Sequence, residues 1–421
     1  MERGSHLAGA KGFFRVVSTE RARELLAAVR PVRETEVIEV KQAARRVLAG
    51  PVRARSDVPH FDRAVMDGYA VRAADTFGAS ESQPGYLRIQ GTIEMGEHAR
   101  TPLASRAAMR ISTGGMLPPG ADAVVMLEYT EELPDGSVEI RRGVAPGENV
   151  QRVGEDVKRG TVLFERGWRL RPFDLGGLTG TGVVSVRVFR RPRVALIATG
   201  DEIVPPEQQP RPGQVRNINE YALVPMLAEA GADVTDYGVV RDDPDALRSA
   251  LAKALETHDA VMLSGGSSVG AKDMALSIIM SFPKSSVAFH GISIAPGKPT
   301  ILAHAQGKPV FGIPGHPMSA LVVGMLFAVP LVRILGGEAP ERAFAPRARI
   351  SATLAEPVAS APGREDYIRV RLEERDGTRY ALPSPGKSAS VFNLIHADGL
   401  VKIPANAEGL EAGTTVEVLL L

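Results

Sequence analysis

The sequence predicts an α/β and β multidomain protein in which one domain is built on a doubly wound parallel sheet. A chain of 421 residues is too long for one ordinary core, because domains hold about 150 residues each, so roughly three domains are expected. Residues 191–337 alternate strand and helix patterns. The stretches around them show short apolar runs broken by Gly and Pro, which indicates β-rich modules.

The composition narrows the possible chemistry. Lys and Arg number 50 against 49 Asp and Glu, so neither nucleic acid nor a membrane is expected as a partner. The chain has no Cys, which excludes disulfides, thiolate metal ligands and cysteine nucleophiles. The apolar residues 318–332 fall short of the ~20 needed to span a bilayer and contain Pro330, which predicts a buried helix. The first residues lack the apolar core of a signal peptide, so a cytoplasmic location is expected.

The elements follow in order along the chain. Residues 15–52 predict two short helical stretches joined by the extended TEVIEV, and residues 53–149 predict a β-rich module. Residues 150–190 contain short strands and a Gly-rich segment. In residues 191–337, the strand RVALIATG, a helix, the strand DVTDYGVV, an Asp-capped helix and the strand DAVMLSGG succeed one another, which favours a right-handed parallel sheet with helices on both faces. Residues 338–421 predict a compact β-domain.

Four loops follow the strands of this α/β segment, where ligands bind in such sheets. They are TGDE at 199–202, RDDP at 241–244, SGGSSVGAKD at 264–273 and PGHP at 314–317. The third loop offers backbone N–H groups and hydroxyls that suit phosphate oxygens, although a plain strand-to-helix turn is the alternative. Its donors are Gly265, Gly266, Ser267 and Ser268. Pro317 suits the first turn of a helix, whose free N–H groups attract anions, and His316 beside it is either a further contact or a solvated side chain.

Acidic residues gather at the same predicted edge. They are Asp201, Glu202, Asp242, Asp243 and Asp273. Mg²⁺ takes one or two carboxylates together with ligand phosphates, so a shared cation is one interpretation. The other is that Asp243 or Asp245 caps the helix that begins near Pro244. Upstream, Asp67-Gly68 is typical of a tight turn, and Thr113 with its two following glycines is either a turn or a phosphate donor.

Eleven motifs in order resemble one family, the MoeA and gephyrin E-domain proteins, which are molybdenum insertases. These motifs are FDRAVMDGYAV, ISTGGMLPPGADAVVMLE, PGENVQRVGEDVKRGTVL, VALIATGDEIV, GQVRNINEYAL, VVRDDPDALR, LSGGSSVGAKD, APGKP, IPGHPMSALV, PGREDYIRV and HADGLVKIP. The motifs lie between residues 61 and 404, and the resemblance that they carry covers the chain from about residue 16 to its end.

The resemblance implies an elongated homodimer of four domains that inserts molybdate into adenylylated molybdopterin and releases AMP with Mg²⁺. Residues 15–52 plus 150–190 would form a linker and dimerisation domain, and residues 191–337 a MogA-like molybdopterin-binding domain. The cleft would lie between the α/β domain of one subunit and the β-domain of the other. The adenylyltransferase that supplies the substrate is a possible partner protein.

The resemblance also assigns roles to residues. The catalytic acids would be Asp67, Asp156, Glu202, Asp242 and Asp273, the last three being metal ligands. The substrate-binding residues would include the four of the Gly/Ser loop together with Thr113, Lys298, Pro314, Gly315, Pro317, Arg364 and Ser388. In this family Pro314 and Pro317 are helix-start prolines.

Several positions depart from the family pattern. They are Arg63, Ala64, Ala271, Ala295, His316, Lys387 and Ala389. Because the five acids are kept, we expect activity with altered ligand contacts. The loss of polar groups favours one alternative, a paralogue kept as a dimeric scaffold. The likeness of the α/β segment to MogA favours another, a molybdopterin adenylyltransferase.

Overall fold

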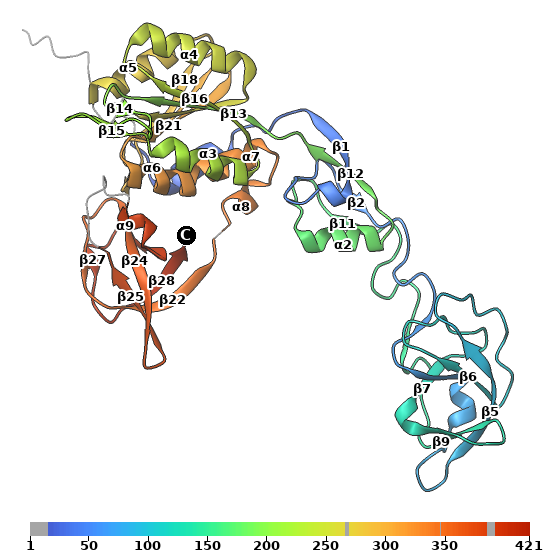
Figure 1. The fold of residues 1–421 in the computed structure, drawn as a ribbon. Coiled ribbons are helices and arrows are strands. Elements are labelled where there is room, and N and C mark those ends of the chain that lie inside the picture. The colour runs from blue at the N-terminus through green and yellow to red at the C-terminus, as the bar shows by residue number, and fades with distance from the viewer. Residues whose placement is uncertain (1–15, 266–268, 346, 385–391) are drawn as a thin grey trace, which may run out of the picture.

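The predicted fold class is confirmed by a computed structural model of the protein. It describes residues 16–265, 269–345, 347–384 and 392–421, and only the backbone of 269–273, 393 and 394. Figure 1 shows an elongated chain in which the α/β lobe and the C-terminal β-domain form one end and a β-rich lobe forms the other. A small segment made from two distant parts of the sequence lies between these ends.

The α/β lobe is built on a six-stranded sheet in the order β16-β13-β17-β21-β20-β18. Its strands are β13 (Arg193–Thr199), β16 (Asp233–Val240), β17 (Ala260–Gly265), β18 (Ser286–His290), β20 (Ile301–Ala305) and β21 (Lys308–Pro314). The first four in the order are parallel, as predicted, whereas β20 pairs antiparallel with both of its neighbours, β21 and β18. Only Gln306 and Gly307 separate β20 from β21, both with positive φ, and such a short turn can join only antiparallel strands.

Helices cover both faces of this sheet. Strand β13 shows why, because Val194 and Leu196 enter one apolar core while Ala195 and Ile197 enter the other, and all four are fully buried. Helices α4 (Pro244–Thr257) and α5 (Val269–Met280) lie on the Ala195 side. Helix α3 (Asn219–Ala230) and the apolar helix 317–335 lie on the other side, together with α1 (Thr19–Ala27).

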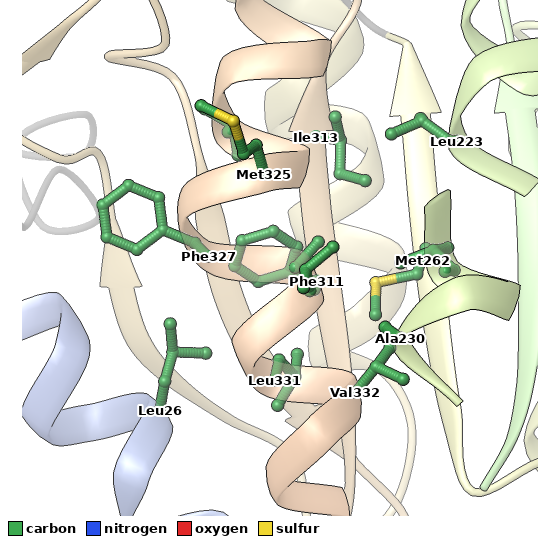
Figure 2. Packing of buried hydrophobic residues seen from close by; sticks show 14 of the residues in the cluster. Leu26, Leu223, Ala230, Met262, Phe311, Ile313, Met325, Phe327, Leu331 and Val332 are labelled. Atoms are coloured by element: carbon green, nitrogen blue, oxygen red, sulfur yellow. The ribbon is translucent and has the colours of Figure 1, made fainter. Parts of the chain in front are cut away.

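The apolar helix is a core element. It comprises α6 (Pro317–Val323), a π-helical turn (Gly324–Ala328) and α7 (Val329–Leu335). Within the described residues it is the one helix long and apolar enough to cross a membrane, but 83% of its most apolar window is buried inside the fold. Figure 2 shows Phe327 and Leu331 of this helix among side chains from the sheet and from α1. The predicted buried helix is therefore confirmed.

The small middle segment differs in part from the sequence prediction. The expected extended piece is β1 (Thr35–Glu39), which pairs antiparallel with β12 (Ser185–Phe189). The prediction of a second helical stretch is wrong, because only a 3₁₀ turn (Val40–Gln42) forms there. Beyond it the backbone bonds across the segment, with Arg45 N donating to Leu170 O at 2.7 Å, so tertiary pairing overrides local helix propensity. The Gly-rich segment is instead a helix, α2 (Pro172–Gly180).

The two β lobes have different constructions. The β-rich lobe is a six-stranded sheet that includes β4 (Gly68–Val71) and β6 (Ala107–Ile111), with an apolar core on each face. In the C-terminal lobe five strands pair in a closed ring, which makes a barrel around one apolar core. The barrel strands are β22 (Arg349–Leu354), β24 (Glu365–Arg375), β25 (Thr378–Pro383), β26 (Gly399–Ile403) and β28 (Thr415–Leu420). A short strand of the α/β lobe, β19 (Ile294–Ala295), pairs with β24 and joins the two lobes.

Candidate functional site

The loops after β13 and β16 bring Asp201, Glu202 and Asp242 together, and we call these three residues the acidic edge. The Asp242 N–H donates to Asp201 Oδ1 at 3.2 Å, while Asp242 Oδ1 is buried without a hydrogen-bond partner among the described residues. Burial, followed by the negative charges of Asp201 and Glu202, raises the pKa of Asp242. Carboxylates that repel one another and leave an oxygen unsatisfied are suited to share a cation.

The acidic edge is not a complete metal cage by itself. Among the described side chains, no group of three or more His, Asp or Glu residues is arranged to hold a metal ion. The Asp273 side chain, a predicted ligand, lies outside the described set, although its backbone belongs to α5. Asp243 instead caps α4, with Oδ1 accepting from the Ala246 N–H at 2.8 Å, so the capping interpretation is confirmed for this residue.

Gly265 is required where β17 ends beside β13. Its φ is 143°, and a Cβ built on it would lie 2.2 Å from Thr199 O, so only glycine permits this approach of the two strand ends. The predicted phosphate-binding residues that follow it, Gly266, Ser267 and Ser268, lie outside the described residues, as does Ser388.

The PGHP turn leads from β21 into the apolar helix. Pro317 is the first residue of α6, as predicted, but Pro314 ends β21 instead of beginning a helix, because the backbone stays in register with β17 up to that residue. The buried Asn219 fixes the turn, since its Nδ2 donates to Gly315 O at 2.9 Å. His316 is exposed and makes no side-chain capping bond.

Two cavities meet at this turn. The first, which we call the notch, has a volume of about 280 Å³ and lies at the strand ends, where Glu202, Asn219 and Gly265 are among its walls. The second, which we call the cleft, has a volume of about 650 Å³ and lies between the α/β lobe and the barrel. Gly315 and His316 line both cavities. One ligand could therefore extend from the notch into the cleft.

The cleft carries cationic side chains. Lys298 and Arg364, both predicted binding residues, line it and are exposed. The Arg364 guanidinium donates to both oxygens of the buried Asp366, at 2.8 and 3.2 Å, and Ser360 Oγ donates to Asp366 Oδ2 at 2.9 Å. A two-bond pair to a fixed carboxylate orients the planar guanidinium. The chain thus presents a positioned Arg at the mouth of the cleft.

Three predicted residues lie elsewhere. Asp67 and Thr113 meet in the β-rich lobe, where Thr113 N–H and Oγ1–H both donate to Asp67 Oδ1, at 2.6 and 3.0 Å. These bonds, the backbone one first, lower the pKa of Asp67. Asp156 is exposed in the segment after β10 (Val150–Gln151). Within one chain the β-rich lobe, which holds Asp67 and Thr113, lies at the opposite end from the α/β lobe (Figure 1), and none of the three residues lines the cleft.

Sequence reasoning missed two residues that shape the site. Asp366 follows Arg364 by two residues, and side chains two residues apart in an extended segment point to the same side. This spacing was the signal available in the sequence. Asn219 is different, because its two acceptors, Gly315 O and Ser264 Oγ, are distant in the sequence and only the fold brings them near. Of the departures from the family pattern, Ala64 is buried in a β-rich core and Ala295 lines the cleft.

Three family models cover most of the chain. The model of the MoeA N-terminal region (domain I and II) matches residues 17–182, and that of the MoeA C-terminal region (domain IV) matches 351–421. Between them, a model described as a probable molybdopterin binding domain matches residues 195–334, which contain the acidic edge and the notch. Fold and site together define a multidomain protein of molybdenum cofactor biosynthesis.

Individual relatives agree with this class. The molybdopterin molybdenumtransferase of Bacillus subtilis is 33% identical, over 92% of this chain and 90% of that protein. The protein of the same name from Nostoc is 34% identical, over 92% and 89%. A crystal structure of the molybdopterin biosynthesis moeA protein from Pyrococcus horikoshii superposes with a TM-score of 0.82 at 29% identity, over 97% of this chain and all of that one. The chain therefore belongs to the MoeA family, and these names favour neither the scaffold nor the adenylyltransferase alternative.

Proposed function

We propose that the protein is a molybdopterin molybdenumtransferase that inserts molybdate into adenylylated molybdopterin and releases AMP. The observation that carries the proposal is the meeting of the notch and the cleft at Gly315 and His316. A substrate with a phosphoanhydride needs a cation on its phosphates and a separate cationic surface for its other anionic groups. The names of the full-length relatives support the same reaction.

The acidic edge fits a divalent cation of the Mg²⁺ type. Within the described part of the chain Asp242 Oδ1 is buried without a hydrogen-bond partner, and the charges of Asp201 and Glu202 oppose ionisation of Asp242. Mg²⁺ prefers oxygen ligands and completes its shell with water and substrate phosphates, which suits an edge that supplies only part of a shell. We propose Glu202, Asp242 and Asp273 as its ligands, and when bound the ion neutralises charge on the phosphate oxygens.

The cleft is proposed to bind the anionic parts of the substrates. Lys298 supplies a mobile point charge, whereas Arg364 supplies a guanidinium already oriented by Asp366. The helix start at Pro317 adds free N–H groups that favour anions. We propose that Gly265, Gly315 and Pro314 shape the walls and that Gly266, Ser267, Ser268 and Ser388 contribute further contacts.

The absence of Cys from the sequence suits this chemistry. The substrate carries its own dithiolene sulfurs as ligands for molybdenum. Because the chain has no Cys, no protein thiol competes with these sulfurs. Cleavage of the phosphoanhydride depends mainly on positioning and on neutralisation of charge, and both follow from the acidic edge and the cleft. A reaction of this kind requires no nucleophile from the protein.

A homodimer is proposed to complete the site. None of Asp67, Thr113 and Asp156 lines the cleft of its own chain, and the lobe that holds the first two is at the far end of the chain, so we propose that they contribute through a second copy. The Asp67 carboxylate, held by two bonds from Thr113, would then face a cleft in the partner. We propose that this enzyme acts in the cytoplasm on substrate supplied by an adenylyltransferase.

The test of the function is AMP release. Purified protein with adenylylated molybdopterin, molybdate and Mg²⁺ should release AMP, and omission of molybdate should prevent the release. The control is MgATP with molybdopterin, which an adenylyltransferase would consume and this protein should not. If no AMP appears under conditions in which the Bacillus subtilis relative is active, the proposed function is wrong.

The test of the shared site is a mixing experiment. Asp67→Ala and Asp242→Ala should each be inactive alone, because each spoils every site of its own dimer. Mixed dimers would hold one intact site and one doubly altered site, so dissociation and reassociation of an equimolar mixture should restore about a quarter of the wild-type rate. A mixture that stays inactive, although light scattering shows dimers that exchange subunits, contradicts the shared site.

A further inference from the structure

A second cavity between the α/β lobe and the barrel is not used by the proposed function. It has a volume of about 450 Å³, and we call it the basic cavity. The apolar helix borders both inter-lobe cavities, with Met318 and Ser319 in the cleft and residues further along, such as Met325 and Val329, in the basic cavity. The buried Tyr367 of β24 is the one residue that lines both. The two cavities thus lie on either side of Tyr367.

Positive charge dominates the walls of the basic cavity. Its charged lining residues are the cations Arg23, Arg333, Arg347, Arg349 and Lys402 and the single acid Glu417. Two of the cations have acidic partners, since Lys402 pairs with Glu365 and Arg333 lies 3.9 Å from Glu338, which Arg169 shares. Within the described part of the chain, no ion pair forms at Arg23, Arg347 or Arg349. These three guanidinium groups therefore have no ion-pair partner among the described residues.

The surroundings make this excess charge unfavourable without a ligand. Packing that removes water lowers the pKa of Arg347, and the nearby charge of Arg333 lowers it further, while Glu229 opposes the shift. The Nε atom of Arg23 is buried, and no described residue forms a hydrogen bond with it. Like charges that are held close together are stabilised when an anion enters between them.

Apart from Thr414 and Thr415, the remaining lining residues are apolar. The apolar helix contributes Met325, Leu326 and Val329, and the barrel contributes Leu400 and Leu419. Leu400 is fully buried, and Leu419 packs against the same core. Ligand sites of this kind combine an apolar body with a few placed charges, and volumes of roughly 300–1,000 Å³ are usual for them. The basic cavity has both properties.

We propose that the basic cavity is a second ligand site, and that it binds a small organic anion with an apolar or aromatic body. The anionic group would lie among Arg23, Arg347 and Arg349, and the apolar body would lie against Met325 and Leu400. An extended peptide is disfavoured because the described barrel strands close into a ring, so no free strand edge is available at which a peptide backbone could pair. The inference is independent of the reaction proposed for the cleft.

The probe for this site is 8-anilinonaphthalene-1-sulfonate, an aromatic anion whose fluorescence rises in an apolar environment. Its neutral matched control is N-phenyl-1-naphthylamine, which lacks only the sulfonate. We expect saturable binding of the sulfonate to one site per chain, at least about tenfold tighter than the neutral compound, because hydrogen bonds to charged groups add that much. Equal affinity for the two compounds would overturn the charge argument.

Variants assign the bound probe to the basic cavity. Arg347→Gln/Arg349→Gln should weaken binding of the sulfonate about tenfold and leave the neutral compound unaffected. These two side chains are exposed, so the fold should be kept, and thermal unfolding checks this. The matched control is Arg371→Gln/Arg379→Gln, two exposed arginines of the same barrel outside the cavity. A second control, Lys298→Gln in the cleft, should bind as the wild type does.

Two outcomes contradict the proposal. If the Arg347→Gln/Arg349→Gln variant binds the sulfonate as tightly as the control variants do, the unpaired guanidinium groups do not form a site. If Lys298→Gln is the variant that loses binding, the probe occupies the cleft. Neither outcome depends on AMP release, so failure of the proposed reaction and failure of this site can be told apart.

Discussion

The acidic edge contributes Glu202 to the notch, which meets the cleft at Gly315 and His316, and the acidic edge and the cleft handle charge differently. At the acidic edge one carboxylate oxygen of Asp242 has no hydrogen-bond partner in the portion that the structure describes, and two other acids lie nearby. In the cleft Arg364 is already paired with Asp366 through two hydrogen bonds. The difference teaches that the first region needs a charge from outside, whereas the second offers a charge that is oriented before any ligand arrives.

The largest effect is expected from a substitution in the acidic edge. Asp242→Asn should lower the rate of AMP release about 100-fold or more, since removal of one preorganised group at a developing charge costs about that much. Without Mg²⁺ the variant should unfold at the same or a higher temperature, because a carboxylate that is repelled by its neighbours is gone. Mg²⁺ should raise the unfolding temperature of the wild type and not of the variant.

Three further variants sharpen this test. Glu202→Ala and Asp273→Ala should lose turnover in the same way and keep the dimer. Asp245→Asn is the matched control, because Asp245 lies in the first turn of α4 beside the capping residue, is exposed, and is not part of the acidic edge. Full activity in Asp242→Asn would show that the acidic edge does not hold the cation.

The next largest effect is expected when Arg364 in the cleft is no longer oriented by Asp366. Asp366→Asn should free the Arg364 guanidinium and raise the KM for the anionic substrate about tenfold with a smaller change in kcat, because a bidentate, charge-assisted pair is lost. The control is Glu373→Gln, which breaks the matching pair of Glu373 with Arg375 at the exposed end of the same strand. A large fall in kcat with unchanged KM would contradict a positioning role for Asp366.

Much of this comparison was predictable from the sequence. Parallel strands that end in TGDE, RDDP and PGHP bring those loops to one sheet edge for topological reasons, and the acidic edge forms where that rule predicts. The buried apolar helix and the cap at Asp243 were predictable too, since each depends on local composition and spacing.

Other features depend on contacts between distant residues. Lys298 and Arg364 were placed by resemblance alone, and nothing local indicates that β19 and β24 pair to put them in one cleft. The segment at Arg45 has helical composition but bonds instead to the chain near Leu170. In both cases the deciding energy comes from tertiary partners, which a local pattern does not encode.

The smallest expected effect concerns the acid pair Glu220 and Asp236. It tests whether this pair is held together by a shared proton, in contrast to the acidic edge, which we expect to bind a cation. Burial, then a hydrogen bond and repulsion from Asp236, raise the pKa of Glu220 from 4.5 to about 7, while Asn217 opposes the shift. Glu220 therefore binds its proton more tightly in the folded state. Its contribution to stability is complete below about pH 4.5 and is lost as the pH rises through about 7.

Glu220→Gln should remove this loss of stability at high pH. The variant should match the wild type near pH 4.5 and exceed it by about 1 kcal/mol above pH 7, a value that allows for solvent screening of a partly exposed group. Chemical unfolding at a series of pH values measures this, with Glu207→Gln, an exposed acid nearby, as the control. Mg²⁺ should leave the difference unchanged, because a carboxyl that shares a proton with Asp236 has no unsatisfied charge to offer, unlike Asp242. A gain that is equal at all pH values, or that disappears with Mg²⁺, would place Glu220 with the acidic edge instead.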